Sequence, residues 1–316
     1  MKSGIVIRST GSWFTVRDDE GTRYECRIRG NLRLKGIQTT NPVAVGDRVD
    51  FQYLEKESQD HGQLIGMIQK IYERQNYIIR RSQNLSHPAH IIAANIDQAL
   101  LVVTISYPVT TTTFIDRYLA SAEAYRIPVV LVFNKTDRYT PAHFETLHQL
   151  TQLYTHLGYP CLHTSALSME GMEDLKNKMK DKISVFNGHS GVGKSTLINL
   201  LQPGLNLRTC EISDYHEKGK HTTTFSELFE LSFGGYIIDT PGIKAFGMLE
   251  MEPWEISHYF REIFSTSSNC QYNNCSHTHE PQCAVKDAVE KGDIALSRYI
   301  SYLGLLESDD KYRQPF

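Results

Sequence analysis

The order of two nucleotide-binding motifs constrains the fold of this chain most. Residues 188–196 read Gly-His-Ser-Gly-Val-Gly-Lys-Ser-Thr and match the phosphate-loop pattern G-x-x-x-x-G-K-[ST] without a mismatch. The guanine-recognition motif Asn-Lys-Thr-Asp, at residues 134–137, precedes this loop, whereas it follows the loop in an ordinary GTPase. Both motifs of a GTP site are therefore present in reversed order. We expect an α/β fold built on a circularly permuted P-loop GTPase domain.

Each part of the phosphate loop has a chemical role. The glycines let backbone N–H groups wrap an anion closely, and the helix expected at residues 195–201 points its N-terminal dipole at the phosphates. Lys194 is expected to reach the β- and γ-phosphates, and the Ser195 hydroxyl is expected to bind Mg²⁺. The predicted nucleotide-binding residues of this segment are Gly188, His189, Ser190, Gly191, Val192, Gly193, Lys194, Ser195 and Thr196.

A second-switch segment is expected after the phosphate loop. Residues 236–239 form an apolar strand that ends in Asp239 and continues into Thr-Pro-Gly. The Asp239 carboxylate is expected to hold Mg²⁺, and the Gly242 N–H is expected to meet the γ-phosphate.

Two threonine runs compete for the role of the first switch. In the run at residues 222–224, a threonine such as Thr222 or Thr223 is expected to contact Mg²⁺ and the γ-phosphate. The similar run at residues 110–113 precedes the phosphate loop, so we expect it to cap a helix near residue 114 instead.

Specificity for guanine is expected from the motif that ends a strand at residues 129–133. Asp137 can accept two hydrogen bonds from guanine N1 and the exocyclic amine, which adenine cannot donate. The following Thr-Ser-Ala-Leu segment is expected to give a backbone N–H to the guanine oxygen. The predicted base-binding residues are Asn134, Lys135, Thr136, Asp137, Ser165 and Ala166.

One group of an ordinary GTPase is missing. Many GTPases carry a water-orienting glutamine directly after the second-switch glycine, but this chain has Ile243, which cannot orient water. His221 is the nearest polar candidate, and two interpretations stay open for it: a catalytic histidine or a solvated loop histidine. The predicted catalytic residues are His221, Lys194 and Asp239.

A metal site is expected after the GTPase domain. Residues 270–283 have the spacing Cys-x4-Cys-x-His-x5-Cys, and three thiolates with one imidazole complete a tetrahedral, structural Zn²⁺ site. The predicted ligands are Cys270, Cys275, His277 and Cys283, although the spacing also admits His279 in place of His277. Helical spacing of apolar residues at 254–264 and 294–303 predicts a small helical domain around the zinc.

The remaining cysteines, at positions 26, 161 and 210, are isolated and predicted to act as small apolar residues. The N-terminal residues lack a secretory pattern, and no apolar run approaches the ~18 residues of a membrane span. We therefore expect a chain without a membrane span, in the reducing cytoplasm.

The first 70 or so residues predict a small barrel of the OB type. Five alternating strands are expected at residues 4–8, 13–16, 24–29, 49–53 and 64–71. Basic residues (Arg27, Arg29, Arg33 and Lys35) and aromatic residues (Trp13, Phe14 and Tyr24) gather there. They indicate either an RNA-binding face or an ordinary solvated strand face. Because the formal net charge is −3, any RNA contact must come from local patches.

Taken together, these motifs resemble the bacterial RsgA (YjeQ) family over nearly the whole chain. The resemblance rests on a barrel, a permuted GTPase with Gly-x-Ser-Gly-Val-Gly-Lys-Ser, and the Cys-x4-Cys-x-His-x5-Cys spacing. It implies a Mg²⁺-dependent GTP hydrolase that the small ribosomal subunit stimulates, contact with ribosomal RNA, and a role late in maturation of that subunit. It also suggests His221 as the residue for hydrolysis.

The expected organisation is an OB-type barrel at residues 1–72, the GTPase domain at 73–249 and a helical zinc-binding domain at 250–316. The expected partners are GTP, GDP and the small ribosomal subunit with its RNA, and the chain is expected to be a monomer with one zinc. Two other functions stay open: a GTP-regulated RNA-binding module without significant turnover, and a permuted GTPase of large-subunit assembly.

Overall fold

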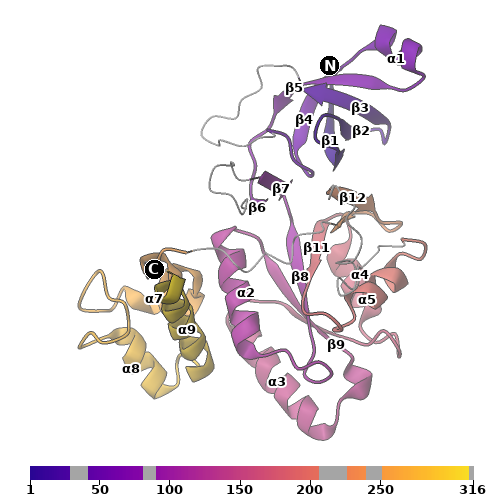
Figure 1. Cartoon of the computed structure of the whole chain (residues 1–316). Helices are drawn as coiled ribbons and strands as arrows, with labels where there is room; N and C mark the ends of the chain where they lie inside the picture. Colours follow the sequence, from indigo (N-terminus) through magenta and orange to yellow (C-terminus); the bar gives the residue numbers. More distant parts are fainter. Residues whose placement is uncertain (29–41, 81–89, 206–225, 240–250, 313–316) are drawn as a thin grey trace. The chain divides into compact units, whose positions relative to one another are not determined.

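The computed structural model describes residues 1–28, 42–80, 90–205, 226–239 and 251–312 (Figure 1). The chain forms two compact units. The first consists of Met1–Ala99, Leu175–Asn187 and Ser195–Lys244, and the second of Leu100–Asp174, Gly188–Lys194 and Ala245–Phe316. The division separates the phosphate loop up to Lys194 from the helix that follows it, so the loop belongs to the same unit as the guanine-recognition motif.

A closed five-stranded barrel begins the first unit. Its strands are β1 (Lys2–Ser9), β2 (Phe14–Asp18), β3 (Arg23–Ile28), β4 (Arg48–Tyr53) and β5 (Ile65–Ile71). They hydrogen-bond in the order β1-β2-β3-β5-β4, and β4 pairs back with β1 (Figure 1). Helix α1 (Glu55–His61) connects β4 to β5. The predicted OB-type barrel is confirmed.

Alternate residues of the barrel strands point inward and form its core. In β2 the buried positions are Phe14 and Val16, and in β3 they are Tyr24 and Cys26. This period of two is the period at which side chains change faces along a strand. Phe14 and Tyr24 are 0 % and 6 % exposed, so neither ring is free to stack on an RNA base. That part of the predicted RNA-binding face is wrong, because these rings fill the barrel.

Beyond the barrel, the described residues of the first unit form further strands and helix α5. Strands β6 (Tyr77–Arg80) and β7 (His90–Ala94) form an antiparallel pair. Strand β13 (Tyr236–Asp239) lies between β11 (Ile183–Asn187), which is parallel to it, and β12 (Glu227–Glu230), which is antiparallel. Helix α5 (Lys194–Leu201) follows the phosphate loop, as the sequence predicts.

Among the described residues, the strands of the second unit follow the order β10-β9-β8. They are β8 (Gln98–Val103), β9 (Val129–Asn134) and β10 (Cys161–Thr164), and β9 and β10 run parallel. Every residue of β8 and β9 is buried, which is typical of parallel strands covered on both faces. The helical elements between them are α2 (Thr112–Ala124), η1 (Thr136–Arg138) and α3 (Pro141–His156). Helix α4 (Met172–Met179) follows β10, and from Leu175 onward it belongs to the first unit.

The first threonine run caps α2. Thr111 is the N-cap, and its side chain accepts a hydrogen bond from the Phe114 backbone N–H at 3.2 Å. This bond satisfies one of the free N–H groups at the start of a helix. The expectation for residues 110–113 is confirmed.

Helices make up the C-terminal part of the second unit. They are α6 (Pro253–Ile256), η3 (Ser257–Tyr259), α7 (Arg261–Ser267), α8 (Ala284–Lys291) and α9 (Leu296–Tyr312). The sequence predicts one helix over residues 254–264, but the chain is interrupted at Phe260 (φ −108°, ψ 100°). Phe260 is fully buried and packs edge-on against Tyr302, with ring centroids 5.7 Å apart. Burial of this ring therefore overrides the helical pattern.

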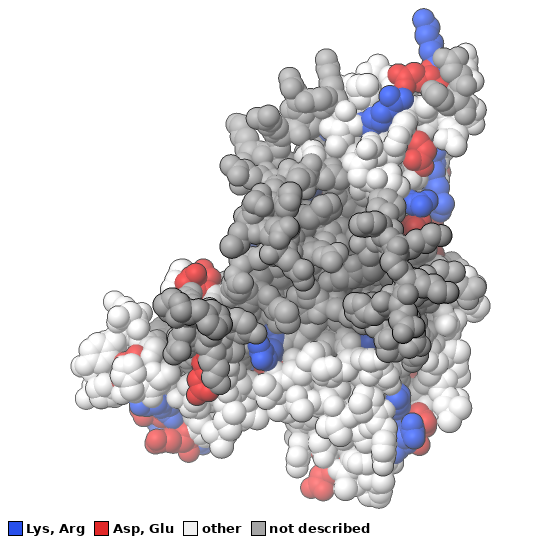
Figure 2. Space-filling view, in the orientation of Figure 1, with Lys and Arg blue, Asp and Glu red and all other residues white. Residues whose placement is uncertain are grey.

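Within the described ranges, no helix has both the length and the apolar character needed to cross a membrane. On the face shown in Figure 2, the Lys and Arg residues are intermixed with Asp and Glu residues, in keeping with the small formal net charge of −3.

Candidate functional site

Two glycines of the phosphate loop have no room for a side chain. Gly188 follows β11 with φ 136°, and a Cβ there would lie 2.2 Å from the Val102 carbonyl oxygen. Gly193 has φ 98°, and a Cβ there would lie 2.4 Å from the Asn134 side-chain nitrogen. Both positions combine a left-handed backbone with a close approach, which only glycine accepts without strain. The loop is therefore pressed tightly against strands β8 and β9.

The phosphate-loop lysine is folded over its own loop. Its Nζ donates to the carbonyl oxygens of Gly188 at 2.8 Å and His189 at 2.6 Å. These bonds keep the positive charge within the ring of backbone atoms that the loop forms. Lys194 is thereby placed to meet an anion held by the same loop.

The guanine-recognition motif is joined to the phosphate loop by two side chains. The Asn134 amide nitrogen donates to the Val192 carbonyl oxygen at 2.8 Å, and its amide oxygen accepts from the Thr164 hydroxyl at 3.0 Å. Lys135 Nζ donates to the Gly191 carbonyl oxygen at 2.6 Å and to the Tyr107 carbonyl oxygen at 2.7 Å. The two motifs, reversed in the sequence, thus meet in space.

The surroundings of Lys135 lower the pKa of its amino group. Burial lowers the pKa of Lys135, the neighbouring Arg138 lowers it further, and Asp137 opposes both effects. Its two hydrogen bonds to carbonyl oxygens hold the Lys135 ammonium between the phosphate loop and the Tyr107 segment.

The predicted base-binding residues lie together. The Ser165 hydroxyl donates to Asp137 Oδ1 at 2.5 Å and accepts from the backbone N–H groups of Leu167 and Ser168. Ser165 is fully buried and Ala166 is half-buried, whereas Asp137 is exposed. The carboxylate is therefore oriented by Ser165 and still open to a base.

The other predicted phosphate and Mg²⁺ ligands are only partly described. Ser195 and Thr196 lie in the first turn of α5, and Asp239 ends β13. His221, Thr222, Thr223 and Gly242 lie outside the described residues.

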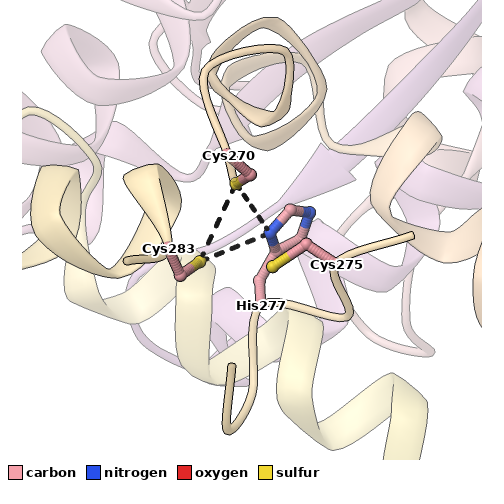
Figure 3. Close-up of side chains that lie close together, drawn as sticks. All are labelled: Cys270, Cys275, His277 and Cys283. Carbon is pink, nitrogen blue, oxygen red and sulfur yellow. Dashed lines mark hydrogen bonds between the residues drawn. The ribbon is translucent and has the colours of Figure 1, made fainter. Parts of the chain in front are cut away.

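A second cluster contains the predicted zinc ligands. One ligand atom from each of Cys270, Cys275, His277 and Cys283 lies within 4.8 Å of the others. His277 Nδ1 is 3.6 Å from Cys270 Sγ and 3.5 Å from Cys283 Sγ, and the two sulfurs are 4.0 Å apart (Figure 3). A tetrahedral zinc with bonds of about 2.3 Å to sulfur and about 2.0 Å to nitrogen sets its ligands at similar separations.

The chemistry of the four groups also fits a metal ion. Burial raises the pKa of the Cys275 thiol to about 12, so neighbouring thiolates need a cation to persist there. Burial lowers the pKa of His277, which favours the neutral imidazole that binds metals. His279 is exposed, and its Nδ1 contacts the Thr278 hydroxyl at 2.9 Å instead. Of the two histidines that the spacing admits, His277 is the one beside the cysteines.

Helix α9 and a carboxylate fix the loop that carries His277. The hydroxyls of Tyr299 and Tyr302 donate to the carbonyl oxygens of His277 at 2.6 Å and Ser276 at 2.7 Å. Glu280 accepts from the Ser276 N–H and hydroxyl, and although burial opposes it, these bonds lower the pKa of Glu280 to about 2. Such outer contacts orient ligands before a metal binds.

Comparison with known proteins identifies the family. The model of the RsgA GTPase family matches residues 71–249, and that of the RsgA N-terminal domain matches residues 3–62. The chain belongs to the RsgA family. It is 56 % identical to the small ribosomal subunit biogenesis GTPase RsgA of Bacteroides fragilis over 315 residues, which cover 99 % of each chain. It is 52 % identical to the RsgA of Flavobacterium psychrophilum over 309 residues, or 98 % of this chain and 94 % of the relative.

Solved structures of similar proteins support the same assignment. The crystal structure of YjeQ from Thermotoga maritima superposes with a TM-score of 0.78 at 36 % identity, covering 99 % of each chain. YloQ, described as a circularly permuted GTPase, superposes with a TM-score of 0.77 at 28 % identity, covering 100 % of this chain and 97 % of that one. As a member of the RsgA family, the chain is a circularly permuted GTPase that hydrolyses GTP.

Some contacts of this RsgA-family site carry no sequence motif. The Tyr107 carbonyl oxygen that accepts from Lys135 belongs to a loop between β8 and α2, and the Tyr139 hydroxyl donates to the Asn134 carbonyl oxygen at 2.8 Å. Thr136 donates to the Glu170 carboxylate at 2.8 Å. The interacting atoms are backbone carbonyls and side chains 5 to 34 positions apart, so no local pattern could have shown them.

Proposed function

We propose that this RsgA-family GTPase binds the small ribosomal subunit, acts late in its maturation, and hydrolyses GTP to GDP and phosphate when the ribosome stimulates it. The observation that carries the nucleotide part is the junction of the two reversed motifs through Asn134 and Lys135. The ribosomal part rests on the names of relatives that match 99 % of the chain at 56 % identity.

In this proposal each part of the site has a role in binding or hydrolysis. The phosphate loop holds the phosphates with Lys194, and Asp137 and Ser165 select guanine. Ser195, Asp239 and one of Thr222 and Thr223 hold Mg²⁺, which neutralises charge on the transferring phosphate. The Gly242 N–H meets the γ-phosphate, and His221 orients the attacking water because Ile243 cannot.

We further propose three domains: an OB-type barrel at residues 1–72, the GTPase at 73–249 and a helical domain at 250–316 held by one structural zinc. The family-model matches at residues 3–62 and 71–249 support the first boundary. The chain acts as a monomer in the cytoplasm, where its proposed partner is assembled.

Ribosomal RNA contact is assigned to the barrel. On its described surface, the guanidinium of Arg27 lies 4.4 Å from the centre of the Trp13 ring and also pairs with Glu57 at 3.0 Å. An arginine stacked on an aromatic ring offers both a charge for phosphate and a flat surface for a base. Arg29, Arg33 and Lys35 lie beyond the residues whose structure is described.

The test separates the proposal from its two alternatives. We expect the chain with a non-hydrolysable GTP analogue to co-sediment with purified small subunits, and phosphate release under multiple turnover to rise when small subunits are added. Stimulation by large subunits alone would favour a role in large-subunit assembly. Binding to small subunits without any rise in turnover would favour a GTP-regulated RNA-binding module.

Asp137→Asn is expected to shift nucleotide preference from guanosine to xanthosine diphosphate. The substitution exchanges an acceptor for a donor, and hydrogen-bonding sites discriminate against a mismatched partner by orders of magnitude. Competition of each diphosphate against a fluorescent GDP analogue measures the shift. Thr140→Ala, which alters the N-cap of α3 instead, is the control. Unchanged guanine selectivity in Asp137→Asn would place the base pocket elsewhere.

His221→Ala is expected to lower ribosome-stimulated turnover by about 10²–10⁴-fold, the usual contribution of a positioned acid–base group. GDP affinity is expected to stay the same, because His221 is proposed to orient the attacking water and not to bind the nucleotide. Phosphate release with small subunits gives the turnover, and equilibrium fluorescence gives the affinity. Normal ribosome-stimulated turnover in this variant would contradict the catalytic role and support the interpretation of His221 as a solvated loop histidine.

A further inference from the structure

The first turn of α2 touches the phosphate loop. The Phe114 ring stacks on the His189 imidazole, with ring centroids 3.7 Å apart and planes inclined by 32°. Burial and the nearby Lys194 lower the pKa of His189, which favours the neutral ring. The carbonyl oxygen of the same histidine accepts from Lys194 Nζ at 2.6 Å. Phe114 therefore supports His189, and the His189 carbonyl oxygen in turn holds the amino group of Lys194.

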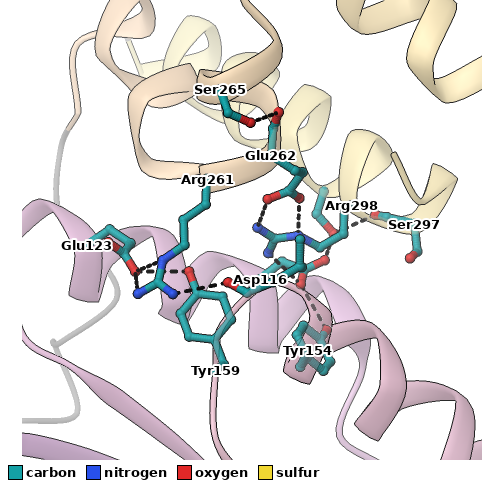
Figure 4. Close-up of polar contacts among 11 residues, drawn as sticks. Asp116, Glu123, Tyr154, Tyr159, Arg261, Glu262, Ser265, Ser297 and Arg298 are labelled. Carbon is teal, nitrogen blue, oxygen red and sulfur yellow. Dashed lines mark hydrogen bonds and ion pairs between the residues drawn. The ribbon is translucent and has the colours of Figure 1, made fainter. Parts of the chain in front are cut away.

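Two residues further along α2, Asp116 is fixed by a buried network. Its carboxylate is fully buried and accepts from Tyr154 at 2.9 Å and Arg298 at 2.9 Å (Figure 4). It also accepts from the Ser301 hydroxyl at 2.6 Å. Arg298 and Ser301 both belong to α9. The start of α2 is thus fastened to the C-terminal helix at one residue and to the phosphate loop at another.

The other contacts of α9 reach the metal cluster. Tyr299 and Tyr302, next to Arg298 and Ser301 in sequence, donate to the carbonyl oxygens of the consecutive residues His277 and Ser276. Consecutive short contacts therefore run from the cluster through α9 and Asp116 to Phe114 and His189. All of these residues belong to the second compact unit.

We propose that α9 positions the phosphate loop for nucleotide binding, with Asp116 as the anchor, Phe114 as the contact and His189 as the positioning residue for Lys194. This inference rests on the proposed nucleotide site and adds a route by which the C-terminal domain affects it. The route does not pass through the switch segments. Energetic coupling between two sites needs a physically continuous connection, and the contacts of α9 and α2 supply one between the metal cluster and the phosphate loop. Measurements on single and double variants decide whether the two sites are energetically coupled through it.

The first experiment tests the contact with the loop in the full-length protein. Phe114→Leu and His189→Ala are each expected to raise the Kd of a fluorescent GDP analogue by about 3- to 10-fold, the range of an aromatic pair. Because both remove the same stack, the double variant is expected to be no weaker than either single variant. Phe114→Tyr keeps the ring and is expected to restore wild-type affinity. Fully additive losses would overturn the proposed contact.

The second experiment tests the link to α9. Ser301→Ala removes one hydrogen bond to Asp116 and is expected to raise the same Kd at least about 2-fold, with little further effect when Phe114→Leu is already present. Ser297→Ala, one turn earlier on α9, is the matched control and is expected to leave the Kd unchanged. A lower melting temperature for Ser301→Ala with unchanged Kd would overturn the proposal and leave Asp116 a purely structural residue. If the unsubstituted chain bound no GDP, the proposed function would fail, and this inference with it.

Discussion

Cys275→Ala, or removal of metal by a chelator, is expected to unfold the helical region around the cluster while GTP binding persists. The four groups complete a closed ligand shell, so the metal's binding energy appears as stability of the fold around it. For small structural zinc sites this energy is about 10–16 kcal/mol, far more than the remaining core of a small domain can replace. We expect hydrogen exchange to become fast from about residue 250 onward.

The same change is expected to lower ribosome-stimulated hydrolysis strongly, because the helical domain directly follows the second switch in the chain. GDP affinity should fall by no more than the few-fold effect expected from α9. Metal analysis should find one zinc per chain in freshly purified, reduced protein, and none after Cys275→Ala.

Cys161→Ala is the matched control for this prediction. Cys161 is a half-buried cysteine in the same unit, outside the cluster, and its replacement should leave zinc content and hydrogen exchange unchanged. A purified wild-type protein that contains no zinc would refute the site. Zinc removal that leaves ribosome stimulation complete would refute only the link between the helical domain and hydrolysis.

The nucleotide site and the metal cluster could be predicted from sequence because their chemistry is local. A phosphate loop needs its glycines and lysine at fixed spacings, and three cysteines with a histidine within fourteen positions have few other uses. The reversed motif order was readable for the same reason, since each motif is complete in itself.

The faces of the barrel could be predicted only in part. Alternation separates Phe14 and Val16 from Thr15 and Arg17, but both sets of β2 contain a large side chain. The period of two predicts which residues share a face of the strand. It does not predict which face lies inside the barrel once β4 pairs with β1. The placement of Phe14 and Tyr24 on an RNA-binding face was wrong for that reason.

The packing between α2 and α9 could not be predicted at all. Asp116 and Arg298 are 182 positions apart, and each is a charged residue in a helical pattern, which indicates an exposed position. Only the fold brings them together in the interior. The interruption at Phe260 has a related cause, because the guanidinium of Arg298 lies 4.6 Å from the centre of that ring.

Arg298→Met is expected to destabilise the second unit by about 3–5 kcal/mol, the usual effect of removing one partner of a buried ion pair. The Arg298 side chain is 1 % exposed, and it pairs with Asp116, which is fully buried, and Glu262, which is 10 % exposed. Methionine fills similar volume but leaves both carboxylates without a cation. Urea unfolding followed by hydrogen exchange in α2 and α9 measures the loss.

The pH dependence identifies the cause of that loss. Burial raises the pKa of Asp116, and Arg298 opposes this effect. In Arg298→Met the opposition is gone, so the folded protein holds its proton at Asp116 to higher pH than the unfolded chain does. When folding raises the pKa of a carboxyl group, the free energy of unfolding decreases with increasing pH. The decrease begins near the pKa of the unfolded chain, about 3.9, and continues up to the pKa of the folded protein. The stability gap to wild type should therefore narrow as pH falls from 7 to 5.

Arg261→Met provides the matched comparison, because Arg261 also pairs with α2 from the helical domain. Its side chain is 42 % exposed, its partner Glu123 is 27 % exposed, and they lie 2.7 Å apart (Figure 4). Exposed pairs contribute about 0–1 kcal/mol, so the loss should be several times smaller than for Arg298→Met. Adding Asp116→Asn to Arg298→Met removes one unpaired buried charge and should recover part of the stability. Equal losses for the two arginines, with no recovery, would show that the buried network does not hold α2 to α9.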